Sequence, residues 1–145
     1  MKYQTGEVGR VIIAKFEDGD VILDNLIDIA RKENISAGIF YLVGGIKNAR
    51  IVVGPEKEEL PPTPSWRGLK ESHEMLGIGT IFWHDDEPKI HLHGAYGKHD
   101  SSKVGCLREI AETFIVLEGI IFELKGTTAI RKPDLKSGMI LLDIP

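Results

Sequence analysis

The sequence predicts an α+β protein built mainly on an antiparallel sheet of about seven strands. Two observations lead to this fold class. Short stretches rich in β-branched residues recur along the chain, and most are separated by turns too short to hold a crossover helix. Only Val21–Glu33 has the apolar periodicity of a long helix. Parallel strands would need more crossover helices, so we expect the strands to run mainly antiparallel.

The composition is that of a single folded domain. The chain has 145 residues, of which 42% are hydrophobic and 28% charged, and its net charge is −4. This length suits one domain with its own core, so we expect residues 1–145 to form one unit. No secretory signal and no apolar run long enough for a membrane helix is present. The single cysteine, Cys106, predicts a reducing, cytoplasmic compartment.

The first third of the chain predicts strand, helix and strand in turn. Val8–Phe16 is apolar and β-branched, which indicates a strand, and Asp20 is placed to cap the helix that follows. In Val21–Glu33 the apolar residues share one face, acidic residues come early and basic residues late, which matches the helix dipole. Ile35–Ile46 and Ala49–Val53 are the next two expected strands.

The rest of the chain is predicted to supply four more strands. Gly54–Gly68 is rich in proline and is expected to be a long loop. Gly97–Gly105 is polar and is expected to be another loop. Cys106–Ala111 fits either a second, short helix or an extended arm. The expected strands are Glu74–Trp83, Lys89–Tyr96, Thr113–Leu124 and Met139–Ile144.

The clearest chemical signal is the pair His91 and His93, which are separated by one residue of an expected strand. Alternate residues of a strand point to the same face, so both imidazoles project together. Two neutral imidazoles are half of a site for zinc or another transition metal. Cys106, a thiolate donor, is the candidate third ligand, with His99 and Asp100 in reserve. The alternative is that both histidines are half-buried polar residues of the sheet.

Other residues have a functional and a structural interpretation. Cys106 alone fits a nucleophile, or a small buried apolar residue. Glu74 opens a glycine-containing strand, where a partly buried carboxylate could act as a general acid or base, and a structural role is equally consistent. Glu118 fits better as a solvent-facing or interface charge, and Arg131 could pair with either glutamate. Trp66 is either an exposed anchor for a partner or a side chain folded back on its own domain.

Several enzyme and nucleic-acid signatures are absent from the sequence. It contains no dinucleotide fingerprint, P-loop, nucleophile elbow or HExxH motif. The densest basic group, Arg131-Lys132, is too small to indicate a nucleic-acid surface. These absences favour a binding or regulatory module over an enzyme.

The order of several short segments resembles the plants-and-prokaryotes conserved (PPC) domain family, also known as a domain of unknown function and as a PD1-like DNA-binding domain. The resemblance covers nearly the whole chain. The segments that carry it are Gly9-Arg10-Val11-Ile12, Glu17–Ala30, Leu42-Val43-Gly44-Gly45-Ile46, Ala49-Arg50, Glu74-Met75-Leu76, Gly79-Thr80-Ile81, His91-Leu92-His93-Gly94-Ala95, Val104-Gly105-Cys106-Leu107, Glu118-Gly119-Ile120-Ile121, Glu123-Leu124, Arg131-Lys132-Pro133-Asp134 and Ser137-Gly138.

The resemblance implies a compact, mainly antiparallel domain that stands alone in prokaryotes and assembles as a homotrimer. In the family pattern the two histidines are followed by a Gly-Gly-His element, and these histidines look like metal ligands in prokaryotic members. Here the first two positions fall on His91 and His93, and the third falls on Cys106. The thiolate either replaces the imidazole and keeps a zinc site, or marks a site that has lapsed.

Two functions are consistent with this resemblance. The first is a trimeric, zinc-carrying regulatory protein related to DNA binding or transcription, although the Arg-Gly-Arg-Pro core of the plant AT-hook is missing and the only Arg-Gly pair is Arg67-Gly68. The stretch around Glu74 corresponds to a partner-interaction segment of the plant domain. The second is a small zinc-dependent enzyme, in which His91, His93 and Cys106 hold zinc and Glu74 is the general acid or base on an unidentified small molecule.

Overall fold

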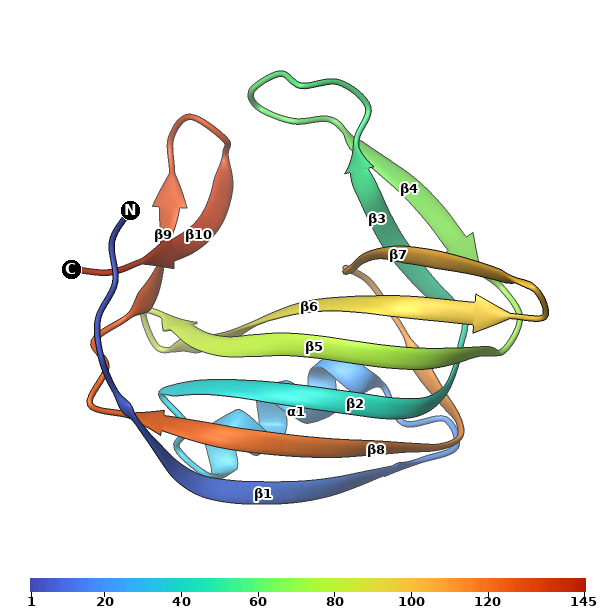
Figure 1. Cartoon of the computed structure of the whole chain (residues 1–145), viewed down its shortest axis with the longest axis horizontal. Coiled ribbons are helices and arrows are strands. Elements are labelled where there is room, and N and C mark those ends of the chain that lie inside the picture. Colours follow the sequence, from blue (N-terminus) through green and yellow to red (C-terminus); the bar gives the residue numbers. More distant parts are fainter.

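The computed structural model describes all 145 residues and consists of one helix and ten strands (Figure 1). The predicted α+β class with a mainly antiparallel sheet is confirmed. The elements are β1 (Glu7–Glu17), α1 (Ile22–Lys32), β2 (Ala37–Lys47), β3 (Ala49–Pro55), β4 (Pro64–Leu69), β5 (His73–His84), β6 (Glu87–Lys98), β7 (Ser101–Leu107), β8 (Glu112–Lys125), β9 (Ile130–Asp134) and β10 (Met139–Asp143).

Eight of the strands form one sheet in the order β1-β8-β2-β5-β6-β7-β3-β4, and β9 and β10 pair separately as a hairpin. Every pairing in the large sheet is antiparallel. The helix α1 lies against one face of this sheet, called the inner face here (Figure 1). Its buried residues Ile22, Leu26 and Ala30 join a core of 19 buried residues contributed by both layers.

The helix is present where it was predicted, but it is short rather than long. It spans 11 residues, and the expected end residues Val21 and Glu33 lie outside it. At its start, Val21 is held extended by a β-bridge to Glu112. At its end, Asn34 adopts a left-handed backbone with φ of 52°, which stops the helix.

Asp20 does not cap the helix. Its carboxylate accepts a hydrogen bond of 2.8 Å from the backbone N–H of Glu17 and so stabilises the turn between β1 and α1. The N-cap position belongs to Val21, and no side chain bonds the first helical N–H groups. The helix therefore depends on its buried apolar side rather than on a polar cap, because each fully buried aliphatic side chain contributes about 1.5–3 kcal/mol.

The sheet has more strands than the sequence predicts. The expected loops Gly54–Gly68 and Gly97–Gly105 each contain the start of a strand, β4 and β7. The third unexpected strand is β9, which pairs with β10. β4 is one of the two edge strands of the sheet, a position at which a proline such as Pro64 is tolerated.

A second short helix is absent at Cys106–Ala111. Cys106 and Leu107 end β7, and the following residues form an irregular connection to β8. Cys106 pairs with His93 on one side and with Val52 on the other, so it lies inside the sheet. The extended alternative is therefore the correct one for this cysteine.

The face of the sheet opposite α1, called the outer face here, is strongly apolar and exposed. One row of directly paired residues crosses five strands: Ile13, Ile120, Tyr41, Ile78 and His93. The β9–β10 hairpin covers only the end of this face at Ala37 and Phe82, which cluster with Ala129. The exposed apolar residues of the outer face are Val11, Ile13, Tyr41, Val43, Leu76, Ile78 and Ile120. The helix α1 lacks the length and apolar character needed to span a bilayer.

Candidate metal centre

Two strands bring the predicted ligands together on the outer face. His91 and His93 alternate along β6, and Cys106 lies directly opposite His93 on β7. Residues directly opposite each other in an antiparallel pair project to the same face. Nδ1 or Nε2 of the two imidazoles and Sγ of the cysteine all lie within 4.8 Å of one another. The register between β6 and β7 therefore builds a three-residue cluster from residues far apart in sequence.

The two imidazoles already meet through the atoms that would hold a metal. Nε2 of His91 lies 3.1 Å from Nε2 of His93, and the rings pack edge to face at 84°. Zinc–ligand bonds of about 2.0–2.3 Å in tetrahedral geometry put the ligand atoms about 3.3–3.6 Å apart. The donor set, two nitrogens and one sulfur, is one that zinc accepts, so the residues present fit the ion.

At neutral pH the protonation state of His91 favours metal binding, whereas that of Cys106 opposes it. Burial lowers the pKa of His91 to about 4, and the positive charges of His93, Arg131 and Arg108 act in the same direction. His91 is therefore neutral at pH 7, which is the form that donates a lone pair to a metal. Burial raises the pKa of the Cys106 thiol, and Arg108 and Arg131 oppose this effect. A bound cation would displace the thiol proton.

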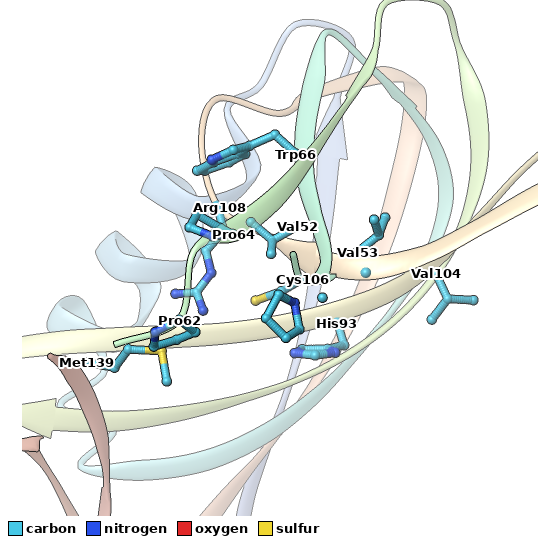
Figure 2. A pocket seen from close by; sticks show the side chains of 13 residues that line it. Val52, Val53, Pro62, Pro64, Trp66, His93, Val104, Cys106, Arg108 and Met139 are labelled. Atoms are coloured by element: carbon cyan, nitrogen blue, oxygen red, sulfur yellow. The ribbon is translucent and has the colours of Figure 1, made fainter. Parts of the chain in front are cut away.

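An open pocket of about 720 Å³ lies beside the cluster (Figure 2). His93 and Cys106 form part of its floor, and valines and prolines of β3 and of the β3–β4 loop form a wall. Trp66 of β4 lines the far side, with the guanidinium carbon of Arg50 at 4.5 Å from its ring centroid. A fourth coordination position on a metal at the cluster would therefore be accessible to a small molecule.

Comparison with known proteins shows the family to which this chain belongs. The sequence pattern of the Plants and Prokaryotes Conserved (PCC) domain, also written PPC, matches residues 3–125. The chain belongs to this family. No curated protein sequence matches it.

Three solved structures share the PCC fold over nearly the whole chain. A PPC protein from Pyrococcus horikoshii has a TM-score of 0.84 and 26% sequence identity, over 100% of this chain and 99% of that chain. A metal-containing protein from Archaeoglobus fulgidus has a TM-score of 0.85 and 21% identity, over 97% of this chain and 98% of that chain. A "putative DNA-binding protein" from Ralstonia eutropha has a TM-score of 0.74 and 22% identity, over 92% of this chain and 90% of that chain.

The PCC fold does not bring Glu74 to the three-residue cluster of His91, His93 and Cys106. Glu74 is exposed on the outer side of β5, four residues from Ile78, the residue that pairs with His93. At about 3.3 Å per residue this places it roughly 13 Å along the strand from the cluster. The reserve candidates His99 and Asp100 lie at the β6–β7 turn, further still from His93. Within one chain the cluster consists of the three residues only.

Three further residues singled out in the sequence, Glu118, Arg131 and Trp66, do not belong to the three-residue cluster. Glu118 is exposed on the outer face, opposite Val43 and Lys15, which fits a solvent or interface charge. Arg131 pairs with neither Glu74 nor Glu118 and instead donates a hydrogen bond of 3.0 Å to Oγ1 of Thr80. Trp66 is half-buried at the pocket and does not belong to the core.

Sequence reasoning missed Arg108 and assigned Arg131 a different partner. Arg108 follows β7 and its guanidinium extends into the pocket in Figure 2. Its position two residues after Cys106 is the only sequence signal that could have marked it. Arg131 is carried by β9, a strand that the sequence did not predict, so its contact with Thr80 of β5 could not be foreseen.

Proposed function

We propose that this chain is a stand-alone PCC-domain protein that binds one zinc ion per chain and assembles as a homotrimer with a regulatory role. The observation that carries the metal assignment is the cluster of His91, His93 and Cys106, whose donor atoms lie within 4.8 Å of one another. The metal-containing protein from Archaeoglobus fulgidus has the same fold and supports this choice. A zinc ion with three protein ligands keeps a fourth position for water or a ligand and supplies Lewis-acid chemistry there.

Cobalt substitution tests the proposed ligand set directly. Co²⁺ bound to a thiolate gives a sulfur-to-metal charge-transfer band in the near ultraviolet, whereas nitrogen and oxygen ligands do not. We expect the wild-type protein to bind one Co²⁺ per chain with this band and to release it on addition of one equivalent of Zn²⁺. Cys106→Ser should remove the band, and the double variant His91→Ala/His93→Ala should lose the metal.

His73→Ala is the matched control for the histidine variants. His73 is partly buried at the opposite end of β5 from Phe82, and the candidate cluster does not include it. Its variant should bind cobalt and zinc as the wild type does. A metal content unchanged in the double variant, or a full charge-transfer band in Cys106→Ser, would refute the ligand assignment.

The apolar outer face supports the homotrimer. Monomeric proteins rarely expose a contiguous apolar patch of this kind, and such patches mark interfaces. The patch is continuous across β1, β8, β2 and β5, because its residues are directly paired from strand to strand. A second copy of this chain is the occupant we propose, and closed symmetry would let each copy bury the same face.

DNA binding is a second candidate function, and one surface feature favours it. A shallow pocket without hydrophobic residues lies at the β6–β7 turn and is lined by Lys70, Lys98, Lys103, His73 and His99, with Glu71 among them. The Ralstonia eutropha protein described as DNA-binding shares the fold. The net charge of −4 opposes non-specific attraction to phosphates, so any DNA surface must be local.

A gel-shift assay at low salt decides this second candidate. Retardation of duplex DNA by the wild type, lost in Lys70→Gln/Lys103→Gln and weakened as salt is raised, would support a DNA surface at the β6–β7 turn. Absence of retardation at low ionic strength would rule it out for this chain.

The cytoplasmic compartment expected from the single cysteine stays a prediction.

The catalytic role of Glu74 also stays a prediction. The position of Glu74 within one chain gives no direct route to the metal cluster. Glu74→Gln should therefore leave cobalt binding unchanged. An effect of Glu74→Gln on the turnover of a small molecule would be the observation that favours an enzyme.

A further inference from the structure

Three cationic side chains next to the candidate metal centre have no anionic partner. Lys89 on β6, Arg108 after β7 and Arg131 on β9 line a second pocket of about 450 Å³, together with His91. The lining of this pocket contains no aspartate or glutamate. None of the three cations belongs to any of the salt bridges of the protein.

Arg131 is the most unusual of the three, because it is buried. Its relative exposure is 7%, and its side chain makes a single hydrogen bond, from Nη2 to Oγ1 of Thr80 at 3.0 Å. The guanidinium carbon lies 5.9 Å from the ring centroid of Phe82, which supports it from one side. A guanidinium has five N–H donors, so most of its donors are unmatched. Buried charges in proteins are ordinarily paired with an opposite charge.

The neighbouring arginine makes this pocket more positive still. Arg108 and Arg131 line the same pocket, so two positively charged guanidinium groups face one space. The chain as a whole has a net charge of −4, whereas this pocket is lined by three cations and no acidic residue. The charge of the pocket is therefore opposite in sign to that of the whole chain. An anion between the two arginines would satisfy free donors and cancel the repulsion.

This cationic pocket adjoins the apolar pocket beside the metal cluster. Arg108 and Met139 line both of them. In Figure 2 the guanidinium of Arg108 lies between Trp66 and Met139, beside Cys106. A molecule with an anionic end among the arginines would extend its other end toward Trp66 and the valines of β3.

We propose that Arg108, Arg131 and Lys89 form a site for the oxyanion group of a small molecule, a phosphate or a carboxylate, whose apolar part lies in the adjoining pocket. The planar donor fork of arginine matches the oxygen spacing of both groups, and Lys89 adds a third positive charge. The site does not need zinc, since none of its three cations is a proposed metal ligand. It would orient a ligand toward the fourth coordination position of a bound metal.

Calorimetric titration of the chelator-treated, full-length protein tests this proposal. The probes are inorganic phosphate and, separately, acetate, each measured against chloride at the same ionic strength. We expect saturable binding of at least one of them with one site per chain. Arg108→Gln and Lys89→Gln should each weaken binding at least tenfold, whereas Lys32→Gln, the same change at an exposed lysine on α1, should stay within twofold.

Arg131 is not substituted first, because the change of a buried residue could unfold the protein. Circular dichroism checks that each variant is folded. Saturable binding of phosphate, of acetate or of both supports the site, and their relative affinity identifies the preferred oxyanion. Absence of saturable heat with both anions, or equal affinity in the wild type and both pocket variants, would overturn it. Phosphate that binds only zinc-loaded protein, with Arg108→Gln unaffected, would place the anion on the metal and also overturn it. Anion binding that persists while the cobalt test fails would refute the zinc assignment alone.

Discussion

Among single residues, Glu123 is a carboxylate that several hydrogen bonds tie to one arginine. It accepts hydrogen bonds from the Arg10 backbone N–H at 3.2 Å and from Arg10 Nε at 3.0 Å, and this arginine also contacts Glu33. The Arg10 side chain and backbone hold the pKa of Glu123 at about 2, below its ordinary value of 4.5. The charged form of Glu123 is thus favoured in the folded state, which links its protonation to stability.

The low pKa of Glu123 predicts a defined loss of stability in acid. Because its pKa is lowered on folding, the contribution of Glu123 is complete above pH 4.5 and disappears as the pH falls from 4.5 toward 2. Thermal unfolding of the wild type and Glu123→Gln from pH 7 to pH 3 should show a difference in Tm that shrinks below pH 4.5. Glu58→Gln, at an exposed loop residue without a salt bridge, should show no such change. A difference in Tm that is constant over the whole range would contradict this assignment.

The orientation of the two histidines could be predicted from sequence, but the place of the cysteine could not. His91 and His93 share a face because any strand puts alternate residues on one side. The contact with Cys106 depends on the register between β6 and β7, and Gly97–Gly105 is too polar to indicate a strand. Its polar residues are compatible with β7 because most of this strand is exposed.

At the level of the elements, the junction of β2 with β8 shows what one glycine permits. The register shifts between Gly44 and Gly45, and Gly44 has a φ of 141°. A Cβ atom at Gly44 would meet the backbone of Val116 and the Cα of Leu117. Opposite it, Ile115 adopts a φ of 63°, so both strands deviate at one bulge. This bulge lets β8 pair continuously with β2 along its length.

Gly44→Ala should therefore destabilise the protein clearly. A side chain at this backbone conformation costs about 1–3 kcal/mol in strain alone, and the contact with β8 adds to it. Gly97→Ala is the control, because a Cβ at that position meets no atom within 4 Å. Its effect should stay within about 0.5 kcal/mol. Urea unfolding of both variants at one protein concentration measures this, and equal midpoints for the two would show that the bulge tolerates a side chain.

One physical reason explains why the sequence predicted some strands and not others. Strongly apolar strands such as β2 and β8 are buried on their inner side, and their pattern was recognisable. β4 begins at a proline and is covered on one edge only, so tertiary pairing rather than composition defines it. The helix was recognisable by its periodicity, and the β-bridge at Val21 and the left-handed backbone of Asn34 made it shorter than its pattern.

For the whole molecule, the apolar outer face predicts the oligomeric state. Leu76 is 67% exposed on this face, and Ile110, in the connection before β8, is 65% exposed elsewhere. Sedimentation velocity at micromolar concentration should show a trimer for the wild type and for Ile110→Glu. Leu76→Glu should sediment as a monomer, because an interface would bury an unpaired charge. A monomeric wild type would refute the trimer, and a trimeric Leu76→Glu would exclude this part of the face from the interface.

The chain has one cysteine, and its side chain is only 4% exposed. A thiol-selective alkylating reagent therefore has one cysteine sulfur per chain to modify. Iodoacetamide reacts with a free thiolate and not with a sulfur bound to a metal. The rate at which the mass of the protein rises would therefore report the fraction of chains in which Cys106 carries no metal. Cys106 thus serves as a probe of metal loading at the proposed site, and mass spectrometry can read it in mixtures and at low concentration.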